Sequence, residues 1–252
     1  RDQVAAGGGA AAGPLTIFAS CLVDRAQPAA GRALERIARA AGYRVEFPAA
    51  QWCCGLIAAN AGRFDQGAAL ARELLEALGP SEGPVVTPSA SCFGALSFDS
   101  SDWGVNGAGL DALRERLHDS TRFVLGLLEK RPGLVTRGDP VRVAYHDSCQ
   151  SLRQLGLKAE PRRLLELCGY EVVDLPDIAN CCGFGGTFSL DWPQVADRLT
   201  EWKLDAVRQT GARLLASDNP GCLLQIEAGA RRRRLDLRVA HVLELVAERL
   251  AG

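Results

Sequence analysis

The sequence feature that most constrains this chain is an internal repeat of cysteines along its 252 residues. One cysteine, an adjacent pair and a further single cysteine occur in the first half, and the same pattern returns in the second half. The first three recur 128 residues later and the last recurs 130 residues later: Cys21, Cys53, Cys54 and Cys92 correspond to Cys149, Cys181, Cys182 and Cys222. Gene duplication explains this pattern better than chance and predicts two homologous domains.

The predicted strands and helices follow the same order in both halves. In the first half, strand-like runs at 15–18, 43–47 and 84–87 alternate with amphipathic helices at 33–41 and 66–78. The counterparts in the second half are strands at 141–145, 170–175 and 213–217 and helices at 161–168 and 193–209. Two more helices are predicted, one at 110–130 that bridges the halves and one at 239–250 that closes the chain. Such alternation is typical of an α/β fold with a small, mainly parallel sheet flanked by helices in each half.

The repeat and the composition between its halves suggest domain boundaries. We expect a first domain at 14–130 and a second at 141–252, joined by a linker at 131–140 that contains two prolines and two glycines. The glycine- and alanine-rich start, 1–13, is expected to be a flexible tail. Each cysteine follows a predicted strand, and parallel sheets place their sites beyond the carboxyl ends of their strands.

Charge and hydropathy exclude several classes of partner. The net charge is −1, so no nucleic-acid partner is expected. No run approaches the roughly 18 apolar residues of a membrane span, and the start lacks the apolar core of a secretory signal. Nine cysteines, an odd number in a chain without a signal sequence, favour a reducing cytoplasmic compartment. Clustered cysteines in that compartment indicate metal or redox chemistry.

The adjacent cysteine pairs indicate a shared soft acceptor. A disulfide between neighbours in sequence is strained, and each pair is followed by a glycine, Gly55 or Gly183, that lets the backbone approach closely and direct N–H groups at sulfur. Each half therefore supplies four thiolates, which an iron–sulfur cluster or a closed zinc site requires. Ligands from three distant loops, without a Cys-x-x-Cys hairpin, favour the cluster. Zinc and metal-free buried or redox-active thiols remain the alternatives.

Other candidate residues have weaker signals. Cys168 has no partner in the repeat and lies on an apolar helix face, so it is expected in the core. His146 and Asp147 precede Cys149 and could orient its loop, donate to sulfur, shuttle a proton or serve the fold alone. The histidines at 118 and 241 fall in predicted helices and are expected to be structural or exposed. The arginine run 231–234 is interpreted as a solvated face, with docking of an acidic electron-transfer partner as the alternative.

The motifs resemble those of the lactate utilization protein A family over residues 14–250. The residues that carry the resemblance are Ser20-Cys21-Leu22-Val23-Asp24, Cys53-Cys54-Gly55, Tyr145-His146-Asp147-Ser148-Cys149, Cys181-Cys182-Gly183-Phe184-Gly185-Gly186-Thr187-Phe188-Ser189 and Asn219-Pro220-Gly221-Cys222. That family has two tandem cysteine-rich (CCG) domains and is related to the CCG-domain subunit of heterodisulfide reductase and to the glycolate oxidase iron–sulfur subunit. The resemblance implies two CCG domains related by pseudo-two-fold symmetry.

The resemblance also implies a function. This chain would be the cytoplasmic iron–sulfur subunit of a bacterial complex that oxidises L-lactate to pyruvate. Its partners would be the other subunits of that complex, including a ferredoxin-type iron–sulfur protein, through which it could associate peripherally with a membrane. The eight repeated cysteines would hold one or two [4Fe–4S] clusters. We expect the isolated chain not to oxidise lactate, because its sequence shows no hydride-acceptor site.

Departures from the related patterns leave the cluster type open. In heterodisulfide reductase each pattern ends in Cys-x-x-Cys, whereas Ser89 and Asn219 stand at that earlier position here. Four thiolates per site fit an ordinary [4Fe–4S] cluster, so cubane and noncubane forms both remain possible. Gln150 replaces an expected histidine, Leu56-Ile57 replaces a common Gln-Pro, and the first half is the weaker match. The alternative function is a heterodisulfide-reductase-like thiol/disulfide oxidoreductase with an open cluster site. A redox or metal sensor is a third, for which no DNA-binding or effector element is found.

Overall fold

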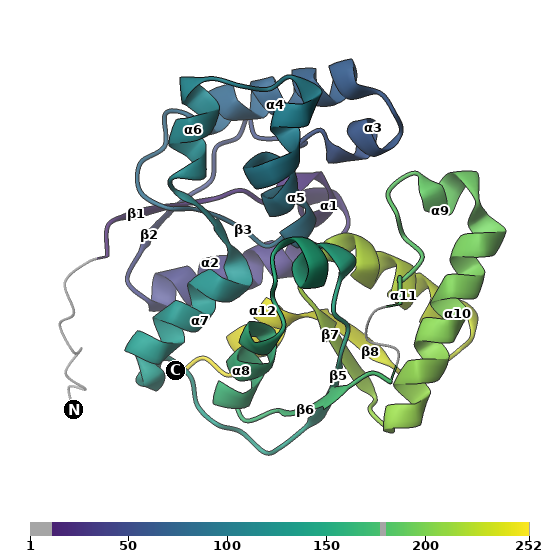
Figure 1. Ribbon diagram of the computed structural model, residues 1–252. Helices are drawn as coiled ribbons and strands as arrows, with labels where there is room; N and C mark the ends of the chain where they lie inside the picture. The colour runs from purple at the N-terminus through teal and green to yellow at the C-terminus, as the bar shows by residue number, and fades with distance from the viewer. Residues whose placement is uncertain (1–11, 177–179, 252) are drawn as a thin grey trace, which may run out of the picture.

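Two four-stranded parallel sheets form the framework of the chain. The computed structural model describes residues 12–176 and 180–251, so most of the predicted tail at 1–13 lies outside the described residues (Figure 1). In spatial order the first sheet consists of β2 (Arg44–Glu46), β1 (Pro14–Ile17), β3 (Val85–Thr87) and β4 (Leu117–Asp119). The second sheet repeats this order with β6 (Glu171–Asp174), β5 (Arg142–Tyr145), β7 (Leu214–Ser217) and β8 (Arg238–His241). Every strand pairing within the two sheets is parallel.

Helices connect the strands in both halves. Those of the first half are α1 (Ser20–Arg25), α2 (Pro28–Ala40), α3 (Leu56–Asn60), α4 (Phe64–Leu78), α5 (Ala90–Gly94), α6 (Ala108–Arg114) and α7 (Ser120–Lys130), with a π-helical turn η1 (Ala95–Asp99) and a 3₁₀ turn η2 (Ser100–Trp103) after α5. Those after the first half are the 3₁₀ turn η3 (Pro132–Leu134), the π-helical turn η4 (Gln150–Gln154), α8 (Ala159–Leu167), α9 (Phe188–Asp191), α10 (Pro193–Thr210), α11 (Pro220–Arg232) and α12 (Val242–Ala247). The α/β prediction and the repeated order of elements are confirmed.

Two predicted helices were wrong, and for the same reason. The helix expected at 110–130 is interrupted by β4, and the one expected at 239–250 starts as β8. Asp119 both ends β4 and caps α7, accepting a hydrogen bond from the Arg122 backbone N–H at 3.0 Å. His241 likewise ends β8 and caps α12, accepting from the Leu243 backbone N–H at 3.2 Å. Because one residue serves as strand end and helix cap, no turn separates the two elements in the sequence.

A single core joins the two halves. Helix α2 packs against α12, and α7 packs against α8, so the four helices lie side by side between the sheets (Figure 1). These two contacts exchange under the pseudo-two-fold symmetry, because α2 corresponds to α8 and α7 to α12. Leu15 and Ile17 of β1 belong to the same buried core as Val143 and Tyr145 of β5. Cys168 lies there at 0% exposure, which confirms its predicted place in the core.

The sheet faces that point away from the shared core carry the residues that position the site. Side chains alternate along a strand, so the residues that follow Ile17 and Tyr145 project away from the shared core. These are Phe18, which packs with α4 and α5 residues, and His146. Helices α10 and α11 cover this outer face of the second sheet. Across the described ranges, no helix combines the length and apolar character needed to cross a membrane.

Candidate metal centre

All eight repeated cysteines line one cavity between the two halves, called here the cysteine cavity. The first cysteine set is Cys21 in α1, the pair Cys53 and Cys54 before α3, and Cys92 in α5. The second cysteine set is Cys149 after β5, the pair Cys181 and Cys182 before α9, and Cys222 in α11. Sequence reasoning predicted both sets at the carboxyl ends of the strands. It did not predict that the two sets face one another.

Each set contains pairs of sulfur atoms that lie close together, although none of the cysteines forms a disulfide. The Sγ atoms of Cys21 and Cys53 are 3.9 Å apart, and those of Cys54 and Cys92 are 3.3 Å apart. The corresponding pair in the second set, Cys182 and Cys222, has its Sγ atoms 3.0 Å apart. Each half therefore brings together the second cysteine of its adjacent pair and the last cysteine of its set.

Exposure differs between the outer cysteines of the two sets. Cys149 and Cys181 are exposed, whereas Cys53 is buried and Cys21 is half-buried. The remaining four cysteines are buried: Cys54, Cys92, Cys182 and Cys222. Solvent thus reaches the second set more easily than the first.

The glycine after each pair is required by the backbone. Gly55 and Gly183 have φ angles of +87° and +94°, which side-chain-bearing residues rarely adopt. A Cβ atom would lie 2.1 Å from the Gly67 carbonyl oxygen in the first case and 2.4 Å from the Ala196 carbonyl oxygen in the second. The N–H of Gly55 lies 3.4 Å from the sulfur of Cys53, and the N–H of Gly183 lies 3.3 Å from the sulfur of Cys181. Both expected effects of glycine, close approach and N–H groups directed at sulfur, are present.

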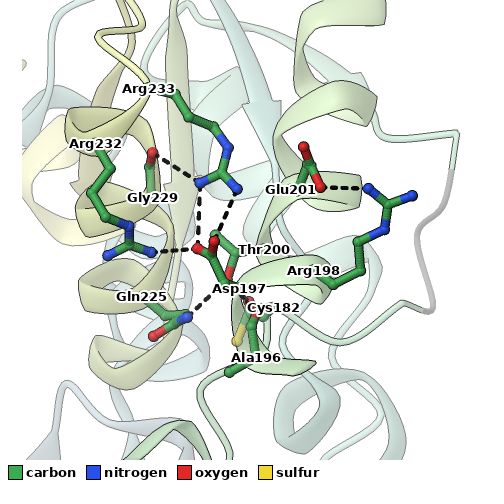
Figure 2. A network of polar contacts seen from close by, with 10 residues as sticks. All are labelled: Cys182, Ala196, Asp197, Arg198, Thr200, Glu201, Gln225, Gly229, Arg232 and Arg233. Carbon is green, nitrogen blue, oxygen red and sulfur yellow. Dashed lines mark hydrogen bonds and ion pairs between the residues drawn. The ribbon is translucent and has the colours of Figure 1, made fainter. Parts of the chain in front are cut away.

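A polar network attaches the second pair to α10 and α11, as Figure 2 shows. The Thr200 hydroxyl lies 3.0 Å from the Cys182 carbonyl oxygen and 2.8 Å from the Ala196 carbonyl oxygen, and it accepts a hydrogen bond from Gln225 Nε2 at 2.8 Å. The equivalent position in the first half is Ala71, four residues after Gly67, so the first pair lacks this anchor. Sequence reasoning missed Thr200. Its only signal was a threonine among the apolar positions of the predicted helix 193–209.

Two arginines of the run 231–234 form ion pairs with a neighbouring helix. Arg232 and Arg233 both pair with Asp197 of α10, with shortest N–O distances of 2.7 and 3.3 Å (Figure 2). Arg231 pairs with Glu227 at 2.6 Å. The first two ion pairs connect the end of α11 to α10 at the surface, and all three favour the interpretation of the run as a solvated face over a role in docking an acidic partner.

Ser89 and Asn219 serve as helix caps at the edge of the cysteine cavity. The Ser89 hydroxyl accepts a hydrogen bond from the Cys92 N–H at 3.4 Å, and Asn219 Oδ1 accepts one from the Gly221 N–H at 3.1 Å. Asn219 also donates to the hydroxyl of Ser91 in the other half. The positions where the related pattern has further cysteines therefore stabilise α5 and α11 and connect the two halves.

His146 lies beside the second set. Its side chain is 1% exposed, and neither ring nitrogen has a hydrogen-bond partner among the described residues. One ring nitrogen and the sulfurs of Cys182 and Cys222 all lie within 4.8 Å of one another. Burial, assisted by the charge of Lys203, lowers the pKa of His146 to about 3, so the ring is neutral.

The other candidate residues do not point at sulfur. Asp147 is buried and forms a two-point ion pair with Arg162, with N–O distances of 2.9 and 2.7 Å. His241 caps α12, and its Nε2 lies 3.1 Å from the Pro88 carbonyl oxygen in the other half. His118 lies in β4 against Phe123. Both of these histidines are in strands rather than the predicted helices, and the buried His241 has the structural role expected.

Crowding of the thiols shifts their pKa values. Hydrogen bonds from the thiols of Cys21 and Cys54 lower the pKa of Cys53 to about 3, while the hydrogen bond to Cys53 raises the pKa of Cys21. Four neighbouring thiols cannot all ionise unless positive charge compensates them. A metal group supplies that charge and binds thiolates in preference to thiols. The donor chemistry of both sets therefore fits a thiolate-ligated metal centre.

An open groove adjoins the cysteine cavity and reaches two cysteines of the first set, Cys21 and Cys53. Residues of α3 and α9 line it, and Figure 1 shows these helices facing each other at the right of the view. Its lining includes two tryptophans, Trp52 and Trp192, which are 42% and 63% exposed. Large exposed aromatic side chains beside a site are typical of surfaces that contact another molecule.

Comparisons with known proteins agree with this geometry. A family model described as a cysteine-rich domain, CCG, matches residues 15–97 and again residues 143–227, and each match contains one cysteine set. A lactate utilization protein A from Macrococcus caseolyticus is 34% identical over 235 residues, which cover 92% of this chain and 95% of that protein. The protein of that name from Bacillus cereus strain B4264 is 32% identical over 248 residues, covering 93% of this chain and 99% of the relative. One from Bacillus pumilus is 33% identical over 243 residues, with 92% and 98% covered.

Proposed function

The chain belongs to the lactate utilization protein A family of tandem cysteine-rich domain proteins, and we propose that it is an iron–sulfur subunit that carries electrons from the oxidation of L-lactate to pyruvate. The nine cysteines, none of which forms a disulfide, support a reducing compartment, the cytoplasm, for this function. The partners are the other proteins of a lactate utilization system, among them a ferredoxin-type iron–sulfur protein.

The observation that carries the proposal is the convergence of two cysteine sets on one cavity. Each set offers four sulfur donors from three loops, which suits a [4Fe–4S] cluster of cubane or noncubane form. When bound, such a cluster accepts and releases one electron at a time. Cys21, Cys53, Cys54 and Cys92 hold the first and Cys149, Cys181, Cys182 and Cys222 hold the second.

The protein's own part is to bind, shield and tune. Buried inner cysteines, such as Cys54 and Cys182, keep water from one side of each centre. The N–H groups of Gly55 and Gly183, directed at sulfur, stabilise negative charge there and so favour the reduced state. The open groove supports an approach route for a partner's redox group, because it reaches the first set from outside.

Metal analysis of the anaerobically purified chain tests the proposal. We expect iron and acid-labile sulfide in equal amounts, about eight of each per chain for two clusters and about four for one. Zinc at one or two per chain without sulfide would contradict the electron-transfer function and indicate a structural metal site instead.

Matched variants test the residue assignment. Cys54→Ala and Cys182→Ala should each remove the iron of one set. Cys168→Ala should keep all of it, because this buried cysteine lies in the shared core, away from the cavity. Equal iron loss in all three would show that folding, rather than ligation, is being measured.

One observation favours a second function, a thiol/disulfide oxidoreductase. Cys149 and Cys181 are exposed residues and all eight cysteines share one cavity, so a small disulfide could approach both sets. A change in the electron paramagnetic resonance (EPR) signal when small thiols are added would favour this function. A signal that does not respond would favour the electron-transfer subunit.

A further inference from the structure

We propose that His146 gives the second cysteine set a side-chain N–H donor that the first set lacks. This donor makes the reduction potential of the second centre the higher of the two. The inference rests on the proposed function, since it requires a metal centre in each set.

The fold aims His146 at the second set. It continues strand β5, with its N–H donating to the Ala216 carbonyl oxygen at 2.8 Å, and alternation turns its side chain to the face opposite Tyr145. There one ring nitrogen lies within 4.8 Å of the sulfurs of Cys182 and Cys222. Two buried cysteines of the second set are therefore within reach of one imidazole.

The imidazole has no other task in the described structure. Leaving a buried polar group without a hydrogen bond is unfavourable, so such groups are rare unless something absent from the protein chain satisfies them. Both ring nitrogens of His146 are in this state at 1% exposure. A metal centre held by Cys182 and Cys222 would satisfy one of them.

The first set has a phenyl ring at the same place. Phe18 follows β1 as His146 follows β5, and its N–H donates to the Val86 carbonyl oxygen at 3.0 Å. It is fully buried in one apolar group with Cys54 and Cys92, the counterparts of the two cysteines near His146. Two sites related by pseudo-two-fold symmetry thus differ by a nitrogen heterocycle against a hydrocarbon ring.

The chemistry of imidazole gives the direction of the effect. A neutral ring has one N–H donor and one nitrogen lone pair. An imidazole N–H directed at a thiolate sulfur stabilises the negative charge of the reduced centre and so raises its reduction potential. This contact makes the second centre the better electron acceptor, so an electron reaching the first centre would move to the second.

Exchange of the two ring residues tests this inference. We would prepare His146→Phe and Phe18→His in the full chain and titrate both centres under EPR. His146→Phe should lower the reduction equilibrium constant of the second centre at least tenfold, which is about 59 mV for one electron, with iron content unchanged. Phe18→His should raise that of the first centre.

A measurement on the unmodified chain makes the test independent of how the variants fold. Pulsed EPR of the protein labelled with ¹⁵N-histidine should show nitrogen coupling to one reduced centre, and His146→Gln should abolish it. Iron–sulfur signals without any nitrogen coupling, or with potentials that His146→Phe leaves unchanged, would overturn this inference alone. A chain without iron and sulfide would overturn the proposed function together with it.

Discussion

Replacing Gly55 by alanine should damage the first cysteine set through the backbone of α4. The residue has a φ of +87°, which costs a side-chain-bearing residue about 1–2 kcal/mol. Its new Cβ would also lie 2.1 Å from the Gly67 carbonyl oxygen, about 1.3 Å inside an ordinary contact of 3.4 Å. Forced repacking of this kind costs about 1–3 kcal/mol. The free energy of unfolding should therefore fall by about 2–5 kcal/mol.

Gly62→Ala is the matched control, because Gly62 has a φ of +77° and nothing lies within 4 Å of the position that a Cβ atom would take there. It should lose only the backbone contribution of about 1–2 kcal/mol and keep its iron. At about 2–4 °C per kcal/mol for a chain of this size, thermal unfolding should drop by roughly 4–20 °C for Gly55→Ala and by roughly 2–8 °C for the control.

Circular dichroism during heating and iron analysis provide the two measurements. Gly55→Ala should also lose the iron of the first set, since separating Gly55 from α4 moves the adjacent pair Cys53 and Cys54. If Gly55→Ala and Gly62→Ala melted together and bound the same iron, the close approach to Gly67 would have no energetic meaning.

Three further variants test other contacts. Thr200→Val should lower the free energy of unfolding by about 1–3 kcal/mol and weaken iron binding in the second set, because the Cys182 carbonyl loses its hydroxyl partner. Thr200→Ser keeps a hydroxyl group and should retain both the stability and the iron. Equal effects of the two variants would contradict a role for this hydrogen bond. Cys168→Ala should melt a few degrees lower with iron unchanged, and iron loss would assign this cysteine to a metal site. Burial and the charge of Asp218 raise the pKa of Asp119 to about 7. Its protonated form therefore stabilises the fold at low pH, and this contribution is lost as the pH rises through about 7. When the pH is raised from 5 to 8, the free energy of unfolding of Asp119→Asn should fall less than that of the unmodified chain, by on the order of 1–2 kcal/mol. Parallel stability profiles of the two proteins over this pH range would refute the burial argument.

The repeat predicted much of the fold because it gave each strand and helix a second example. The three strands before each final cysteine follow from short apolar runs, and the glycine after each pair follows from its conformational freedom. The fourth strands could not be predicted, since Asp119 and His241 each end a strand and begin a helix without a turn between them.

The candidate site was predictable in membership more than in arrangement. Cysteine spacing identified the two sets, but only the packing of α2 on α12 and of α7 on α8 turns them toward one cavity. The role of Thr200 depends on which turn of α10 meets the second pair, and hydropathy does not specify that turn.

The core shared by both halves has a consequence for the ancestry of this chain. A single ancestral unit with this fold would have exposed the apolar faces of α2 and α7, and a homodimer with the same two contacts would have covered them. In such a dimer every mutation appears at both sites at once. Fusion of the two copies into one chain removed that constraint, and positions 18 and 146 could then evolve separately.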